Sequence, residues 1–246
     1  MALRALITRP HDDAVPLAER LAEMGFDSVI DPLLVIDIAA GPALDLHGVQ
    51  AILITSANGA RALARRTPER SIPLFAVGDA SAEIARSFDF TSVDSAAGDV
   101  TALAALVKQR LSPARGSLLH VAGTRVAGNL AGDLEAAGFS LRREVLYAAH
   151  AAHRLADRTV GLMRAGGIGM VLLYSPRTAA TFAALIRESG LEEACKTVTA
   201  FCLSLAVAEA AGDLPFADIR VADIPNQETL IATIEQWQAE RNGRNA

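Results

Sequence analysis

Short turns that carry hydroxyl residues, glycine or arginine are the first candidates for chemistry in this sequence. Each follows a short apolar run and precedes a stretch with helical spacing. They are Thr8-Arg9-Pro10, Thr55-Ser56-Ala57-Asn58, Val77-Gly78-Asp79, Gly123-Thr124-Arg125 and Tyr174-Ser175-Pro176, with Ser204 at the matching place in the last unit. Helix capping alone explains any one of these turns. Together, their N–H groups and hydroxyls could bind carboxylates, because helix N-termini attract anions.

Two arginines and one tyrosine add to this set. Arg9 and Arg125 each follow a predicted strand end, where a ligand would bind, so either ligand contact or plain surface charge explains them. Tyr147 lies in the segment EVLYAA. It is either an amphipathic packing residue or a phenol that donates a hydrogen bond to a departing oxygen.

Common cofactor and metal motifs are absent from the sequence. It contains no GxxxxGK[ST], GxSxG or HExxH pattern and no convincing GxGxxG. The five histidines have no metal-ligand spacing, and Cys195 and Cys202 form no CxxC pattern. We therefore predict no metal, no cofactor and no disulfide, with both cysteines as small core residues in a reducing compartment.

Charge and hydropathy argue against nucleic acid and membranes as binding partners. The net charge is -5 and no basic run exceeds a dipeptide, which argues against nucleic acid. No segment reaches the run of about 18 apolar residues that spans a bilayer. The N-terminus begins a strand without a signal-peptide pattern. We expect a cytoplasmic protein without membrane contact, and a monomer, because no exposed apolar heptad or long edge strand stands out.

The elements that would position these residues alternate between short apolar runs and Ala-rich helical patterns. This order predicts an α/β fold with parallel sheets. The predicted strands are Leu3–Thr8, Asp27–Pro32, Ala51–Thr55, Leu74–Val77, Ser117–Val121, Val171–Tyr174 and Val198–Leu203. The predicted helices include Asp13–Met24, Asn58–Arg66, Ser81–Ser87 and Val100–Leu111.

An internal repeat connects the two halves of the chain. The segment from Leu6, LITRPHDDAVPLAERLAEMGF, matches LLHVAGTRVAGNLAGDLEAAGF from Leu118. AILITSANGARALA from Ala51 matches MVLLYSPRTAATFAAL from Met170, and two further pairs follow in the same order. We therefore expect two similar α/β lobes.

The repeat leaves two domain layouts open. A cut within 112–116 would give one repeat per domain. Alternatively, residues 33–38 and 144–149 would be extended crossovers that pair with each other. The residues alone do not choose between these layouts.

These segments, in this order, resemble the uroporphyrinogen-III synthase family over nearly the whole chain. The resemblance rests on the opening TRP and GFDSVIDPLLVI, then on AILITSANGARAL and AVGDASAEIA. It continues with LLHVAGTRVAGNLAGDLEAAGF followed by VLYAA, and with LLYSPRTAATFAAL. One departure is Phe201-Cys202-Leu203-Ser204-Leu205, where the family commonly has isoleucine-glycine-proline-threonine-threonine. Ser204 keeps a hydroxyl there, but the glycine is lost.

The resemblance implies two flavodoxin- or Rossmann-like lobes with parallel sheets, joined by a two-stranded hinge ladder. Carried over, it gives residues 1–33 plus 151–246 as a discontinuous first lobe and 38–143 as the second. Residues 34–37 and 144–150 would form the hinge crossovers. A substrate would then bind in a cleft that closes by hinge motion.

The resemblance also implies a reaction. The family cyclises hydroxymethylbilane, a linear tetrapyrrole with many carboxylates, and inverts the terminal pyrrole ring through a spiro intermediate without a cofactor. Tyr147 would assist departure of the hydroxyl, and hydroxymethylbilane synthase would be a transient partner. The carboxylates would be bound by Thr8, Arg9, Thr55, Ser56, Gly78, Ser81, Gly123, Thr124, Arg125, Ser175 and Ser204. The alternative is a non-catalytic two-lobed sensor of a tetrapyrrole or another small ligand.

Overall fold

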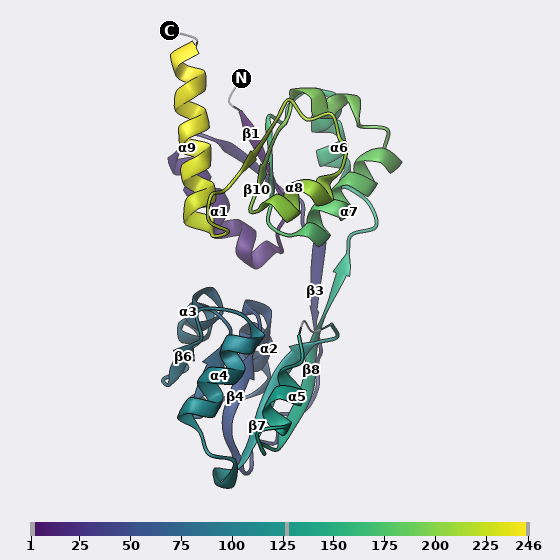
Figure 1. Cartoon of the computed structure of the whole chain (residues 1–246). Helices are drawn as coiled ribbons and strands as arrows, with labels where there is room; N and C mark the ends of the chain where they lie inside the picture. Colours follow the sequence, from purple (N-terminus) through teal and green to yellow (C-terminus); the bar gives the residue numbers. More distant parts are fainter. Residues whose placement is uncertain (1–2, 126–127, 245–246) are drawn as a thin grey trace. The chain divides into compact units, whose positions relative to one another are not determined.

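The chain folds into two compact α/β units, as a computed structural model that describes residues 3–125 and 128–244 shows. One unit comprises residues 1–35 and 150–246, and the other comprises residues 36–149. The α/β class predicted from the sequence is confirmed. Each unit has its own sheet and its own covering helices (Figure 1).

The unit formed by both ends of the chain has a five-stranded parallel sheet in the order β11-β10-β9-β1-β2. Its strands are β1 (Arg4–Ile7), β2 (Asp27–Ile30), β9 (Met170–Leu173), β10 (Thr199–Cys202) and β11 (Asp218–Val221). Its helices are α1 (His11–Glu23), α6 (Asp157–Arg164), α7 (Pro176–Glu188), α8 (Leu205–Ala211) and α9 (Gln227–Arg244), with a short 3-10 turn at Glu193–Thr197.

Helices cover both faces of this sheet (Figure 1). On one face, α6, α7 and α8 pack around Phe182, which is fully buried. On the other face, α1 and α9 pack around Phe201 and Trp237, whose rings meet edge to face at 5.4 Å. The two cysteines are buried in the first of these cores, as the sequence predicts. Because both faces are buried, the three central strands, β1, β9 and β10, are mostly apolar.

The central unit has a six-stranded sheet in the order β3-β8-β7-β4-β5-β6, parallel from β8 to β6. Its strands are β3 (Leu34–Ile38), β4 (Val49–Ile54), β5 (Leu74–Ala76), β6 (Val93–Ser95), β7 (Ser117–Gly123) and β8 (Leu141–Ala151). Its helices are α2 (Ala57–Arg66), α3 (Asp79–Ser87), α4 (Val100–Arg110) and α5 (Leu130–Glu135), with a 3-10 turn at Pro113–Arg115. Alternate strand residues face α2 and α3 on one side and α4 and α5 on the other.

The two sheets have equivalent strand orders, which explains the internal repeat. In the repeat alignment β1 corresponds to β7 and β9 corresponds to β4. In one sheet, β1 is followed by β2 on one side and β9 is followed by β10 on the other side. In the other sheet, β7 is followed by β8 on one side and β4 is followed by β5 on the other side. Each unit combines strands from both copies of the repeat, so a cut within 112–116 does not separate the units.

All seven predicted strands are present, and two short ones, β6 and β11, were missed. β6 and β11 were missed because they lie at sheet edges and are not buried, so they lack an apolar run. The predicted hinge crossovers, residues 34–37 and 144–150, lie within β3 and β8, which are neighbours in the sheet order. Hinge motion there and the lobe boundaries of the sequence analysis stay predictions.

A buried histidine lies in the sheet of the central unit. His120, on β7, is 4 % exposed, and its Nε2 has no hydrogen-bond partner among the described residues. Burial, with a smaller contribution from the positive charge of Arg143, lowers the pKa of His120 from 6.5 to about 4. Arg143 is its register partner on β8. The imidazole is therefore neutral in the fold at neutral pH.

This histidine makes the fold sensitive to acid. In the unfolded chain His120 is protonated below about pH 6.5, whereas in the folded chain it is protonated only below about pH 4. The free energy of unfolding therefore decreases as the pH falls through this range. Between pH 7 and pH 5, the free energy of unfolding of the wild type should fall by about 2 kcal/mol more than that of His120→Leu. Urea unfolding at the two pH values measures this difference.

The exposed His47 provides the control for this measurement. His47→Gln should keep the wild-type difference between the two pH values. Equal pH dependence in the wild type and His120→Leu would show that His120 is not the responsible group.

Candidate functional site

The site of the central unit lies at the carboxyl ends of β4 and β7. These neighbouring strands are followed by connections that run in opposite directions, to β5 and to β8. In open parallel sheets, ligands bind where the strand order reverses in this way. Thr55 and Ser56 follow β4, and Gly123 and Thr124 end β7. The topology therefore brings two of the predicted turns to one point.

Tyr147 lies beside these turns and contacts Ser56 directly. It is the register partner of Gly123 on the adjacent strand, β8. Its phenol oxygen is 2.7 Å from Ser56 Oγ, a hydrogen bond in which either atom could be the donor. Ser56 is also the N-cap of α2, and its Oγ accepts a hydrogen bond from the N–H of Gly59 at 3.1 Å. Two residues singled out separately in the sequence therefore form one pair.

Gly123 provides the space that the tyrosine ring occupies. A Cβ at this position would lie 2.7 Å from Cε2 and 2.9 Å from Cζ of Tyr147. The backbone of Gly123 has no positive φ, so the side-chain contact alone calls for glycine here. The next residue, Thr124, donates its N–H to the carbonyl oxygen of Tyr147 at 3.0 Å. Gly123 and Thr124 thus place the tyrosine, while the Thr124 and Arg125 side chains are exposed.

Arg143 is not among the candidate residues that the sequence indicates. Its Nη2 donates to the carbonyl of Gly123 at 2.8 Å, and the carbonyl of Thr124 lies at 3.4 Å. It therefore holds the turn that follows β7. The register between β7 and β8 creates this contact, and the sequence alone gives no signal for it.

The turn after β5 supplies the remaining predicted positions of this unit. Gly78 is the N-cap residue of α3, and no side chain caps this helix. Ser81 is only 6 % exposed in the first turn of α3, so its hydroxyl faces protein more than solvent. The carboxylate of Asp79 lies in the same turn and would oppose a bound anion. Gly78 is thus the more accessible member of this pair.

In the other unit, the reversal lies between β1 and β9, and three predicted hydroxyls follow its strands. The Thr8 hydroxyl is fully buried and donates to the carbonyl of Leu172 at 2.8 Å, so the sheet itself uses this group. Ser175 caps α7, accepts from the N–H of Thr178 at 3.1 Å and lies 2.9 Å from Thr178 Oγ1. Ser204 precedes α8 and makes no side-chain cap. Because it is buried and already donates to Leu172, the Thr8 hydroxyl cannot contact a ligand in this structure.

Arg9 is held in place by three neighbours at the same edge. Its Nη1 donates to Gln227 Oε1 at 2.7 Å, and its Nη2 is 3.6 Å from a carboxylate oxygen of Asp13. The guanidinium lies 4.3 Å from the centre of the Tyr174 ring, a cation–π contact. Burial raises the pKa of Tyr174 to about 12, so its phenol stays protonated at neutral pH. No local pattern in the sequence indicates the contact with Gln227, because this residue is 218 positions away from Arg9.

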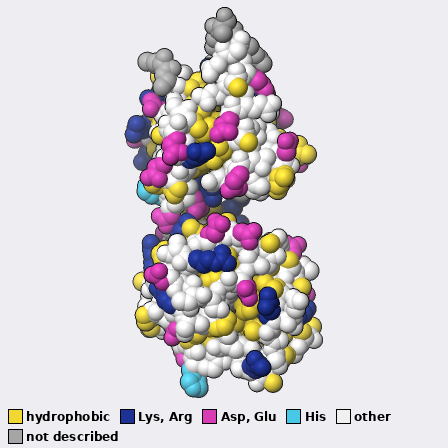
Figure 2. Space-filling model, turned by 90° about the vertical axis from the view of Figure 1, so that its left-hand side faces the viewer, with side chains coloured by type: hydrophobic (Ala, Val, Ile, Leu, Met, Phe, Trp, Pro, Cys, Tyr) yellow, Lys and Arg dark blue, Asp and Glu magenta, His cyan; other side chains and the backbone are white. Residues whose placement is uncertain are grey.

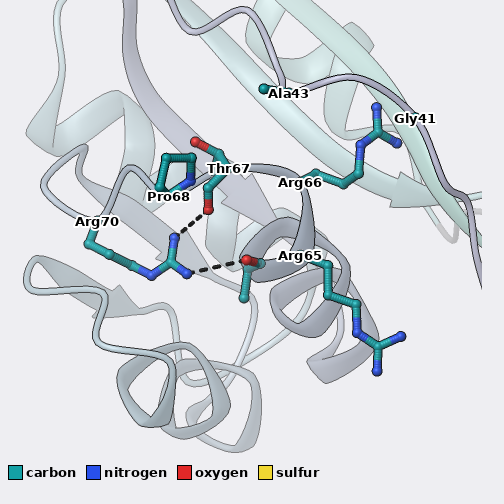
Figure 3. A pocket seen from close by; sticks show the side chains of 8 residues that line it. Gly41, Ala43, Arg65, Arg66, Thr67, Pro68 and Arg70 are labelled. Carbon is teal, nitrogen blue, oxygen red and sulfur yellow. Dashed lines mark hydrogen bonds between the residues drawn. The ribbon is translucent and has the colours of Figure 1, made fainter.

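Two pockets among the described residues are lined by residues other than the predicted turns. One of about 330 Å³ lies where β1 and β2 begin, with Arg4 and Asp27 in its lining. Acidic and basic side chains occur on both units on the face in Figure 2. A pocket of about 410 Å³ in the central unit is lined by Arg65, Arg66 and Arg70 (Figure 3). Arg66 and Arg70 donate to backbone carbonyls there, and the pocket lies at the C-terminal end of α2, where the helix dipole disfavours anions.

Metal-ligand clusters and membrane-spanning helices are absent from the described part of the chain. Among residues 3–125 and 128–244, no group of three His, Cys, Asp or Glu residues could hold a metal ion. Within the same ranges, no helix has both the length and the apolar character needed to cross a bilayer.

The contact between Gly123 and Tyr147 gives a testable prediction. Gly123→Ala should displace the ring, break the hydrogen bond to Ser56 and lower the free energy of unfolding by about 1–3 kcal/mol through overpacking. Thermal unfolding measures the stability, and the NMR signal of ¹³C-labelled tyrosine measures the ring environment. Gly161→Ala is the matched control, because its Cβ would meet nothing within 4 Å and alanine favours its helix. An unchanged Tyr147 signal in Gly123→Ala would disprove the contact.

Comparisons with known proteins identify the family of the chain. The family model described as uroporphyrinogen-III synthase HemD matches residues 15–232. The structure is similar to that of uroporphyrinogen-III synthetase from Helicobacter pylori, with a TM-score of 0.62, 15 % identity, and coverage of 96 % of this chain and 100 % of that chain. A mutant uroporphyrinogen III synthase from the extremely thermophilic bacterium Thermus thermophilus gives a TM-score of 0.51 at 15 % identity, covering 98 % and 100 %. A search of curated proteins found no match. The family model covers most of the chain, and the chain therefore belongs to the uroporphyrinogen-III synthase family.

Proposed function

We propose that this chain is a cyclising hydro-lyase that converts hydroxymethylbilane into uroporphyrinogen III. The family membership supports an enzyme of tetrapyrrole biosynthesis. The single observation that carries the residue assignment is the pair of Ser56 and Tyr147, 2.7 Å apart at the reversal of strand order. A phenol held there is suited to donate a hydrogen bond to an oxygen that leaves the substrate.

The proposed reaction begins when the terminal hydroxyl departs with a proton as water. The resulting azafulvene is attacked by the substituted carbon of the far pyrrole ring, which forms a spiro intermediate. That intermediate fragments and recloses through the free α-carbon of the same ring, now inverted. This carbon loses its proton, which balances the proton that left with the hydroxyl. Spontaneous closure inverts nothing, so the protein has to hold the linear substrate in the reactive conformation.

Binding of the substrate carboxylates is assigned to the turns at the carboxyl edges of both sheets. In the central unit we assign Thr55, Gly78, Thr124 and Arg125, and in the other unit Arg9, Ser175 and Ser204. Arg9 supports this assignment because its guanidinium is fixed by Gln227 and Tyr174 before any ligand arrives. Thr8 and Ser81 are reassigned to structural roles, because their side chains are buried. A monomeric state, a cytoplasmic location and transient contact with hydroxymethylbilane synthase stay predictions.

The test is a coupled assay in which purified hydroxymethylbilane synthase supplies the substrate and chromatography resolves the oxidised products. Type III isomer should rise with added protein. Type I isomer alone, formed at the spontaneous rate, would contradict the proposed function and favour a tetrapyrrole sensor.

Within this assay, Tyr147→Phe should lower kcat by about 10–100-fold, because it removes the proposed donor to the leaving hydroxyl. The only other tyrosine, Tyr174, offers a matched change. Tyr174→Phe keeps the ring beneath Arg9 and should lower kcat by less than about threefold. Full turnover by Tyr147→Phe, with an unchanged isomer ratio, would remove Tyr147 from the mechanism.

A further inference from the structure

Ser56 has a hydrogen-bonding arrangement that substrate binding alone does not explain. A serine oxygen can accept two hydrogen bonds and donate one. Ser56 Oγ accepts one from the N–H of Gly59 at 3.1 Å, and it lies 2.7 Å from the phenol oxygen of Tyr147. Its own proton is therefore free to point at that phenol oxygen. In this orientation the tyrosine proton remains available for a ligand.

The equivalent serine in the other unit is a natural comparison. Ser175 corresponds to Ser56 in the repeat and caps α7 in the same way, by accepting from the N–H three residues further along the chain. Its second partner is Thr178 Oγ1 at 2.9 Å, within its own helix. The contact with a phenol is thus a property of Ser56 and is not required by the cap.

The direction of this hydrogen bond has an electrostatic consequence. When a phenol gives its proton toward a departing oxygen, negative charge develops on the phenol oxygen. A hydroxyl donor at 2.7 Å stabilises that charge, and a donor already in place needs no reorganisation during the reaction. The N-terminus of α2, a ten-residue helix, adds a partial positive charge beside Ser56.

We propose that Ser56 is a positioning residue that donates its hydroxyl proton to the phenol oxygen of Tyr147 and so directs the tyrosine proton toward the leaving hydroxyl of the substrate. This role replaces direct carboxylate binding by the Ser56 side chain. The proposal rests on the proposed function of Tyr147.

A double-mutant cycle tests whether Ser56 acts through Tyr147. Ser56→Ala should lower kcat about five- to tenfold in the coupled assay, the range expected for one hydrogen bond, and should leave KM within about twofold. In the Tyr147→Phe background, the same substitution should change kcat by less than about twofold. Ser56→Thr keeps the hydroxyl and the cap, and should recover most of the lost activity.

Two controls separate this role from loss of a helix cap. Asp99 caps α4 in the same unit by accepting from the N–H of Ala102 at 2.9 Å, and α4 packs on the face of the sheet opposite to α2 and Tyr147. Asp99→Ala should lower the melting temperature about as much as Ser56→Ala does, but should leave kcat unchanged. Ser175→Ala, at a proposed binding residue, should raise KM, and its effect on kcat/KM should multiply with that of Tyr147→Phe.

A readout independent of catalysis completes the test. Tyrosine labelled with ¹³C at Cζ gives two signals, because the chain has two tyrosines, and Tyr147→Phe assigns them. Ser56→Ala should shift the Tyr147 signal and leave the Tyr174 signal in place. Multiplicative effects in the cycle, or a raised KM with unchanged kcat, would overturn the proposal and return Ser56 to substrate binding. Failure of the proposed function appears differently, as absence of type III isomer with the wild-type protein.

Discussion

Burial of both faces of each parallel sheet is the constraint on which the rest of the structure depends. Leu53 faces α4 and α5 while its neighbours Ile52 and Ile54 face α2 and α3, and all three are fully buried. A sheet covered on both faces leaves only its edges for ligands. Parallel strands joined by helices then place each strand end and the following helix N-terminus at one edge. The polar turns that follow the strands therefore lie at this edge.

Tyr147 illustrates how such an edge fixes a reactive group. Three features from two neighbouring turns act on it: the absent side chain of Gly123, the N–H of Thr124 and the hydroxyl of Ser56. Arg143 in turn holds the turn after Gly123. A phenol on β8 is thereby oriented by residues of β7 and by the start of α2. This rigid support suits a reaction in which the enzyme has to select one geometry of a flexible substrate.

The two units share one topology but differ in chemistry at equivalent positions. Ser56 contacts a phenol, whereas Ser175 contacts a threonine of its own helix. Thr124 and Arg125 are exposed after β7, whereas at the end of β1 Thr8 is buried and Arg9 is held by Gln227 and Tyr174. Duplication therefore supplied two similar scaffolds. The local side chains, rather than the fold, distinguish the proposed reactive edge from the proposed binding edge.

The sequence by itself determined the α/β class, the repeat, the positions of most strands and the turns that carry the candidate residues. These features follow from local periodicity and turn chemistry, which short segments encode. It could not reveal that Ser56 contacts Tyr147, that Arg143 holds Gly123 and Thr124, that Gln227 fixes Arg9, or that the Thr8 hydroxyl is used within the sheet. Each of these contacts joins residues from different strands or helices, and most are far apart in the chain. Only the tertiary structure decided them, because strand register and order set which side chains meet, and no local pattern specifies either.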